Sequence, residues 1–184
     1  MDSALAWVGQ IAAWVGRFIP RLLVIEATHG GVKFVRGWKV RQLNSGMHIY
    51  WPLTTKVSFF PIARQADDLR SQTLTTRDAI TVAASALIVF EVSDIKTLLS
   101  TTYDPDTTIQ EIALTAVQDT LTELSWDEIR ETPRRRLDIQ LRSSARAELK
   151  PYGVNVLKMS LVDLAPCKVI RLLGDVPPVS VFPR

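Results

Sequence analysis

The sequence predicts an α+β fold: a twisted, mainly antiparallel sheet packed with helices and preceded by an N-terminal apolar helix. Three observations lead to this expectation. From residue 22 to residue 92 the chain consists of segments rich in β-branched and aromatic residues, separated by turn residues. The following segments have apolar residues at helical spacing, and a last alternating segment can rejoin the sheet. Strands, then helices, then one closing strand is the order of an α+β fold.

The N-terminal helix is predicted from residues 3–20, SALAWVGQIAAWVGRFIP. A helix over residues 4–19 would be about 24 Å long, whereas the hydrocarbon core of a bilayer is about 30 Å thick. Four large apolar residues recur on one face at helical spacing: Trp7, Ile11, Trp14 and Phe18. Because tryptophan favours the boundary between lipid and water, we expect these side chains to enter one leaflet. Deeper insertion past Pro20 and burial against another subunit are the alternatives.

Positive charge accompanies this segment. Residues 1–41 hold six basic and two acidic side chains, whereas the remaining residues hold 16 basic and 17 acidic ones. Basic residues beside an apolar helix are attracted to anionic lipid headgroups by about 1 kcal/mol each near the surface. We therefore expect Arg17 and Arg21 to contact headgroups, and residues 1–21 to form a membrane-associating helix. A chance cluster on a soluble surface is the alternative.

Six strands are predicted after residue 20. The clearest is 79–92, AITVAASALIVFEV, in which every even-numbered residue is apolar and the polar residues fall among the odd-numbered ones. At about 3.3 Å per residue it would span about 45 Å, which is long for one strand, so we expect a bulge near its alanines. The other strands are expected at 22–28, 32–36, 47–51, 57–65 and 68–76.

Three helices and a closing strand follow. A helix is expected over 107–124, capped by Asp106 or Thr107, and the sequence SWDE at 125–128 has the form of a capping box that starts a second one. Thr132 and Pro133 are expected to start a third helix. Its buried stripe should be Leu137, Leu141, Ala145 and Leu149. The closing strand is expected over 152–166, where the alternating residues Leu157, Met159 and Leu161 can rejoin the sheet.

The sequence offers little for catalysis. It has one cysteine, Cys167, and two histidines, His29 and His48, and none of the common nucleophile, phosphate-loop or dinucleotide motifs is present. We expect no enzymatic activity, no cofactor, no metal and no nucleic-acid partner. The basic run 134–136 is expected to be a solvated face paired with Glu128, Glu131 and Asp138. A site for an acidic partner or phosphate is the alternative.

Four stretches together resemble one known family. They are GMHIYWPLTTKVSFFPI (46–62), TLTTRDAITVAASALIVFEVSD (73–94), TAVQDTLTELSWDEI (115–129) and YGVNVLKMSLVDLAP (152–166). In this order and spacing they are similar to the SPFH or band 7 proteins, which include stomatins, prohibitins and flotillins. The resemblance spans roughly residues 24–170, with Ser45-Gly46 where a Pro-Gly pair is more typical. The family commonly continues into a long coiled coil, whereas here residues 169–174 are soon followed by Pro177 and Pro178.

This resemblance implies a function. It implies an SPFH domain over 22–170, after the helix at 1–21 and before a short tail at 171–184. It also implies a membrane-associated, homo-oligomerising scaffold, facing the cytoplasm, that organises membrane microdomains or regulates membrane-bound partners. The implied partners are membrane lipids, further copies of the chain, and a membrane protein or protease. A soluble oligomeric assembly protein, whose apolar helix is a subunit contact, is the alternative function.

Overall fold

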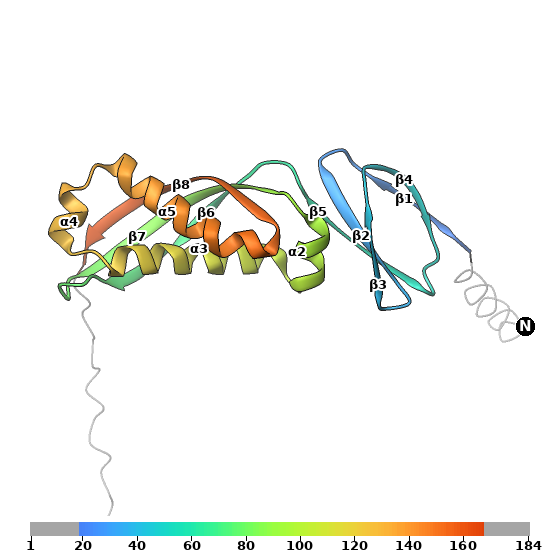
Figure 1. The fold of residues 1–184 in the computed structure, drawn as a ribbon, viewed down its shortest axis with the longest axis horizontal. Coiled ribbons are helices and arrows are strands. Elements are labelled where there is room, and N and C mark those ends of the chain that lie inside the picture. Colours follow the sequence, from blue (N-terminus) through green and yellow to red (C-terminus); the bar gives the residue numbers. More distant parts are fainter. Residues whose placement is uncertain (1–18, 168–184) are drawn as a thin grey trace, which may run out of the picture.

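The computed structural model describes residues 19–167 and shows an elongated molecule with two halves (Figure 1). The all-β half, residues 21–61, contains strands β1 (Arg21–Ile25), β2 (His29–Val35), β3 (Lys39–Leu43), β4 (Gly46–Tyr50) and β5 (Thr55–Pro61). The α/β half, residues 65–166, contains strands β6 (Gln65–Thr75), β7 (Thr81–Val92) and β8 (Val154–Pro166). Its helices are α2 (Ile95–Thr101), α3 (Pro105–Thr122), α4 (Trp126–Glu131) and α5 (Arg134–Leu149), followed by the 3₁₀ turn η1 (Lys150–Tyr152).

The all-β half is built from two thin layers. Strands β1 and β4 pair antiparallel as one ribbon, and β3, β2 and β5 form a three-stranded antiparallel sheet with β2 in the centre. The layers meet closely where Ile25 of β1 packs against Gly31 of β2, because a Cβ atom at Gly31 would lie 2.9 Å from Ile25 Cδ1. Ile25 and Leu43 are buried at this contact.

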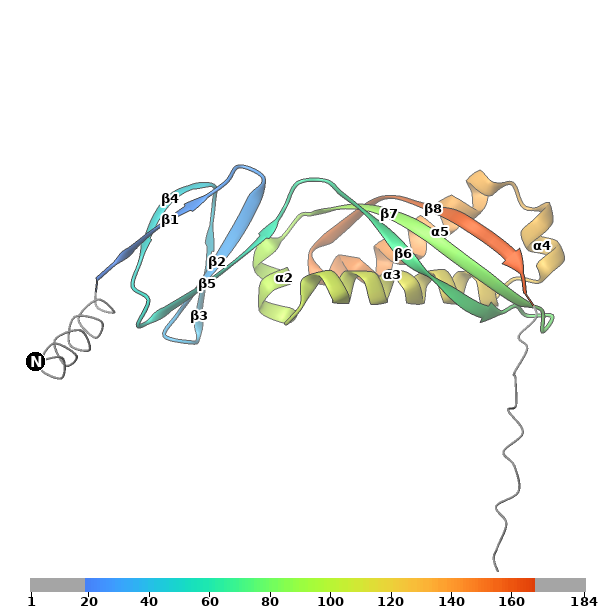
Figure 2. The ribbon, with the colours of Figure 1, turned by 180° about the vertical axis from the view of Figure 1, so that it is seen from behind.

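The α/β half is organised around β7, which pairs antiparallel with β6 on one edge and β8 on the other. The even-numbered residues of β7 from Val82 to Val92 are all buried, in one cluster with the buried faces of α3 and α5. Figure 2 shows both helices alongside this sheet and the all-β half beyond them. The predicted α+β architecture with antiparallel sheets and helices is confirmed, whereas the predicted N-terminal apolar helix lies outside the described residues.

The predicted bulge near the alanines is present. The register between β7 and β8 shifts at Ser85/Ala86 and again at Val89/Phe90. Leu157, Met159 and Leu161 all lie in β8, which rejoins the sheet as expected, but the second shift interrupts their alternation. It changes the alternation of β8, so that Val156 and Met159 are buried and Leu157 between them is half-buried.

The helix caps agree with the sequence in part. The capping box of α4 is present, because Ser125 and Glu128 each accept a backbone N–H from the other. The cap of α3 is Asp104 and not Asp106 or Thr107, because Pro105 starts the helix two residues earlier than expected. Thr132 ends α4 instead of capping α5, and its hydroxyl donates to the Glu128 carbonyl. The expected stripe of α5 is buried in full: Leu137, Leu141, Ala145 and Leu149.

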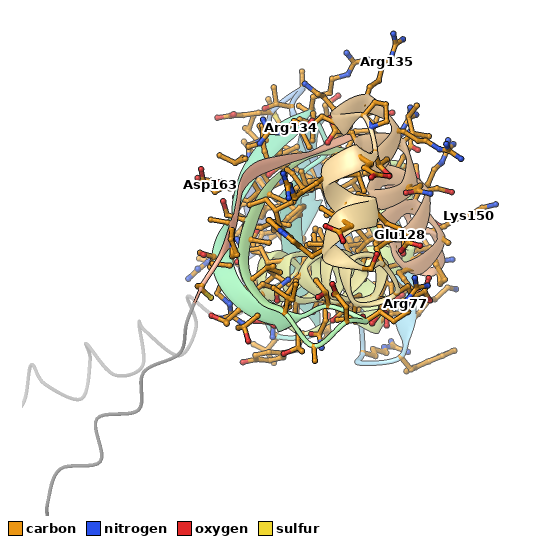
Figure 3. All side chains as sticks on the ribbon, turned by 90° about the vertical axis from the view of Figure 1, so that its left-hand side faces the viewer. Arg77, Glu128, Arg134, Arg135, Lys150 and Asp163 are labelled. Carbon is orange, nitrogen blue, oxygen red and sulfur yellow. The ribbon has the colours of Figure 1, made fainter. Side chains whose placement is uncertain are left out.

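Asp78 ties the β6–β7 turn to the start of α4. Its carboxylate accepts a hydrogen bond from the Thr76 hydroxyl and from the Trp126 N–H at 3.1 Å. Beside it, Arg77 forms an ion pair with Glu128 at 2.9 Å, at the end of the molecule seen in Figure 3. The Thr76 hydroxyl, and secondarily the Trp126 N–H, lower the pKa of Asp78 below its ordinary value of 3.8.

We expect this junction to make stability fall in acid. A carboxylate whose folded pKa is lowered contributes stability that is complete above its ordinary pKa and is lost as the pH falls through the folded pKa. Asp78→Asn should therefore lower the free energy of unfolding at neutral pH. The variant should also lose less of its free energy of unfolding than the parent chain when the pH is lowered from neutral to below 3.8. Urea unfolding of both proteins across this range measures the effect. An identical pH dependence in the two proteins would contradict it.

Gly153 and Gly37 provide a second test of the fold. Both have left-handed backbone conformations, with φ of 76° and 80°. A Cβ atom at Gly153 would lie 2.5 Å from the Asp94 carbonyl oxygen, whereas at Gly37 it would meet nothing within 4 Å. We expect Gly37→Ala to cost about 1 kcal/mol from backbone strain alone. Gly153→Ala should cost more than about 2 kcal/mol, because the chain must also move away from Asp94. Equal losses in chemical denaturation would show that the close approach does not matter.

Candidate membrane-contacting surface

Most residues predicted to contact a membrane precede the described part of the chain. Trp7, Ile11, Trp14, Phe18 and Arg17 lie outside residues 19–167. Arg21 is described, and it opens β1 with its side chain exposed to solvent. Its position at the outer end of the all-β half is consistent with the predicted headgroup contact and does not test it (Figure 1).

The ribbon of β1 and β4 is apolar on its outer side. Leu22 lies opposite Ile49 and Val24 opposite Met47, so these four side chains form two adjacent cross-strand pairs on one face. Each of the four is between 60% and 68% exposed. We call this surface the apolar β1–β4 face. The opposite side of the ribbon, with Ile25, packs against β2.

Further exposed apolar side chains flank this face. Ile19 precedes β1, and Trp51 directly follows β4 and is 53% exposed. Trp38 lies in the turn between β2 and β3 and is 76% exposed. A strand that borders water usually alternates apolar and polar residues, whereas β1 is apolar on both sides from Leu22 to Ile25. Contiguous exposed apolar surface of this kind marks a contact with a membrane or with another protein.

Charge divides sharply between the two halves. Residues 19–66 contain seven basic side chains and one acidic one, Glu26, while residues 67–167 contain 11 basic and 16 acidic ones. No acidic residue occurs from 27 to 66. The all-β half therefore combines an exposed apolar surface with an excess of positive charge, the combination that favours an anionic lipid surface.

The sequence itself carries signals of this exposed apolar surface. The run Leu22–Ile25 is continuously apolar, and such a run usually indicates a strand buried on both sides. The pairing of β1 with β4 alone, as a two-stranded ribbon, leaves one of those sides uncovered. The second signal is that no acidic residue occurs from 27 to 66. A charge count that divides the chain at residue 41 hides this, because the boundary falls inside the stretch without acidic residues.

The residues considered for catalysis are far apart. His29 begins β2 and His48 lies in β4, both in the all-β half, whereas Cys167 follows β8 at the opposite end of the molecule (Figure 1). His48 lies within the predicted strand 47–51, whereas His29 falls between the predicted strands 22–28 and 32–36 and is found at the start of β2. Within residues 19–167, no group of three His, Cys, Asp or Glu side chains could hold a metal ion.

The expected pairing of residues 134–136 is not found. Glu128 pairs with Arg77, and the Asp138 carboxylate accepts the Leu161 N–H at 3.2 Å, so these acids have other partners. Arg134 donates to the Val162 carbonyl at 3.3 Å, and Arg135 points away from the body of the molecule in Figure 3.

Comparison with known proteins agrees with this geometry. Residues 23–172 match the model of the SPFH domain / Band 7 family. The chain is also similar to an uncharacterized protein of Archaeoglobus fulgidus, with 21% identity over 158 residues. This alignment covers 86% of the chain and 63% of that relative. None of the helices within residues 19–167 is long and apolar enough to cross a membrane.

Proposed function

Because the chain belongs to the SPFH domain / band 7 family, we propose that it is a membrane-associated, homo-oligomerising scaffold. Proteins of this family are generally membrane-associated scaffolds without catalytic activity. The role that we propose is to organise membrane microdomains or to regulate membrane-bound partners from the cytoplasmic side. The proposed partners are membrane lipids and further copies of the chain, and beyond these a membrane protein or protease.

The observation that carries this proposal is the apolar β1–β4 face. Residues 3–20, the predicted membrane segment, directly precede β1 in the sequence. A segment held in one leaflet would therefore keep this face within a few residues of the lipid. Moving each exposed apolar side chain from water into the interfacial region is favourable by about 1 to 2 kcal/mol. Four such side chains contribute enough for stable attachment when they act together with the N-terminal segment.

The same face also suits the alternative function, a soluble oligomeric assembly. An exposed apolar patch can be covered by a second copy of the chain as well as by lipid. In that case the patch would be buried in the oligomer, and lipid would not compete for it. The positive charge around the patch favours the membrane, because two like-charged copies repel each other at this surface.

The test is flotation of the full chain with neutral phosphatidylcholine vesicles, compared with the double variant Val24→Thr and Ile49→Thr. Threonine keeps the β-branched shape that suits a strand, and both positions are exposed, so the fold should be unaffected. The variant should bind at least about tenfold more weakly, because two apolar contacts with lipid are lost.

Two controls make the result specific. Ile139→Thr replaces an apolar side chain of similar exposure on α5, in the other half of the molecule, and should bind like the parent chain. Oligomeric state is measured by light scattering on each protein and on a chain lacking residues 1–20. If no protein floats and the deletion or the double variant dissociates the oligomer, the apolar surface is a subunit contact and the soluble assembly replaces the scaffold.

A further inference from the structure

We propose that a cleft in the all-β half binds the phosphate headgroup of a multiply charged anionic lipid. The cleft lies between the β2–β3 hairpin and the end of β4, and has a volume of about 450 Å³. Its walls carry four basic side chains and two tryptophans: Lys33, Arg36, Lys39, Arg41, Trp38 and Trp51. None of the residues that line it is acidic. This inference rests on the proposed membrane association and adds the chemistry of the lipid that is recognised.

The basic side chains are placed together by the pairing of the strands. Lys33 of β2 and Arg41 of β3 are direct cross-strand partners, and Lys39 lies two residues before Arg41 on the same face. Like charges directly opposite each other destabilise a sheet. A pair of this kind gives the fold no advantage, and it becomes favourable only when an anion lies between the two side chains.

These cations lack anionic partners in the described part of the chain. The ion pairs within residues 19–167 involve His29, Arg64, Arg70 and Arg77, and none of them includes a basic residue of the cleft. Their charge is therefore available to a ligand. A phosphate group accepts several hydrogen bonds from arginine and lysine at once, and two phosphates can use four cations.

Arg36 gives independent support, because its backbone is strained. It has φ of 54°, in the left-handed region where glycine or asparagine is the usual residue, and Gly37 follows it with φ of 80°. Its N–H donates to the Thr54 carbonyl at 2.7 Å, which holds the turn against the start of β5. A long basic side chain at such a position costs stability, and this is typical of residues retained for binding.

The tryptophans indicate a lipid rather than a free phosphate. Trp38 and Trp51 line the cleft and are largely exposed, and Ile49 of the apolar β1–β4 face also lines it. A soluble anion has no use for exposed indole rings, whereas a headgroup at the membrane boundary brings both phosphate and acyl chains. Figure 1 shows the β2–β3 turn and the end of β4 together at one edge of the all-β half.

The test uses charge reversal at Arg41 in the full chain. Arg41→Glu should turn the repulsive pair with Lys33 into an attractive one, so the thermal midpoint should rise or stay the same. Binding to phosphatidylcholine vesicles that contain cardiolipin, which carries two phosphates, should nevertheless fall at least about tenfold. Lower binding by a protein that is at least as stable cannot come from unfolding. An unstable Arg41→Glu variant would overturn the inference that this pair costs the fold stability.

The matched control is Lys56→Glu. Lys56 lies on β5, the strand next to β2, but its side chain is on the opposite face of the sheet from Lys33. The Lys56→Glu substitution changes the net charge by the same amount as Arg41→Glu but lies outside the cleft. It should therefore weaken binding to cardiolipin vesicles much less than Arg41→Glu does. Equal losses for Arg41→Glu and Lys56→Glu would overturn the headgroup site and leave only diffuse surface charge.

Three further comparisons separate the possible ligands. The parent chain should prefer cardiolipin to phosphatidylglycerol at equal surface charge, and equal binding would overturn a site for paired phosphates. Soluble glycerophosphate should not displace the protein from vesicles, and displacement would assign the cleft to a free anion. Any binding of duplex DNA should be the same for the parent chain and Arg41→Glu, and an Arg41-dependent complex would assign the cleft to nucleic acid.

The headgroup site and the proposed function can fail separately. If the parent chain binds neutral and cardiolipin vesicles equally, and the double variant Val24→Thr and Ile49→Thr still detaches, membrane association stands and the headgroup site is wrong. If the parent chain binds no vesicles at all, the proposed function fails and the headgroup site fails with it.

Discussion

The α/β half depends on the burial of one face of β7 while both of its edges are hydrogen-bonded. The middle of that face is small, since Ala84 and Ala86 are almost fully buried, and larger side chains such as Ile88 and Phe90 lie beyond them. Buried alanines on the helices, among them Ala116 and Ala145, belong to the same core cluster. The helix backbones come close to each other and to the flanking strands, α5 to β8 and α3 to β6, which closes the core over this face. The positions of α3, α5, β6 and β8 all follow from this one strand.

The all-β half is held together in a different way. Helix α2 packs on the sheet of β3, β2 and β5, where Ile95 lies close to Gly30, and a few side chains of this half, such as Val32 and Phe60, join the main core. Its order therefore rests on strand pairing, on the close contact of Ile25 with Gly31 and on the packing of α2 against β2. Because so few side chains are committed to a core, many of those on its surface are available for binding. Unusual features accumulate there: exposed apolar residues, unpaired cations and the strained backbone of Arg36.

The sequence predicted most of the fold because local patterns determine most of it. The alternation in β7, the stripe of α5 and the capping box of α4 are short-range signals, and each appears in the structure. Strand β3 was missed because KVRQL is largely polar, and its charged residues lie on a surface instead of alternating with a core. Helix α2 was missed because seven residues give too few turns for a helical period.

The candidate site was less predictable than the fold. The cleft needs Lys33 opposite Arg41, and strand register is a long-range property that no short window of sequence contains. Exposure of Leu22 and Val24 likewise depends on which face of the β1–β4 ribbon packs against β2, and the sequence of β1 alone does not decide this. The membrane-inserting side chains of residues 7–18 lie outside the described residues and remain a prediction.

The unequal charge of the two halves has a consequence for how the molecule approaches a membrane. An elongated body with an excess of positive charge in residues 19–66 and of negative charge in residues 67–167 has an electric dipole moment along its length. An anionic bilayer exerts a torque on such a dipole and turns the all-β half towards the lipid before any contact is made. At physiological ionic strength the field extends only about 8 Å, so this orientation acts during the last step of approach. The side chains that recognise lipid would then meet it first, and the α/β half would remain directed away from the surface.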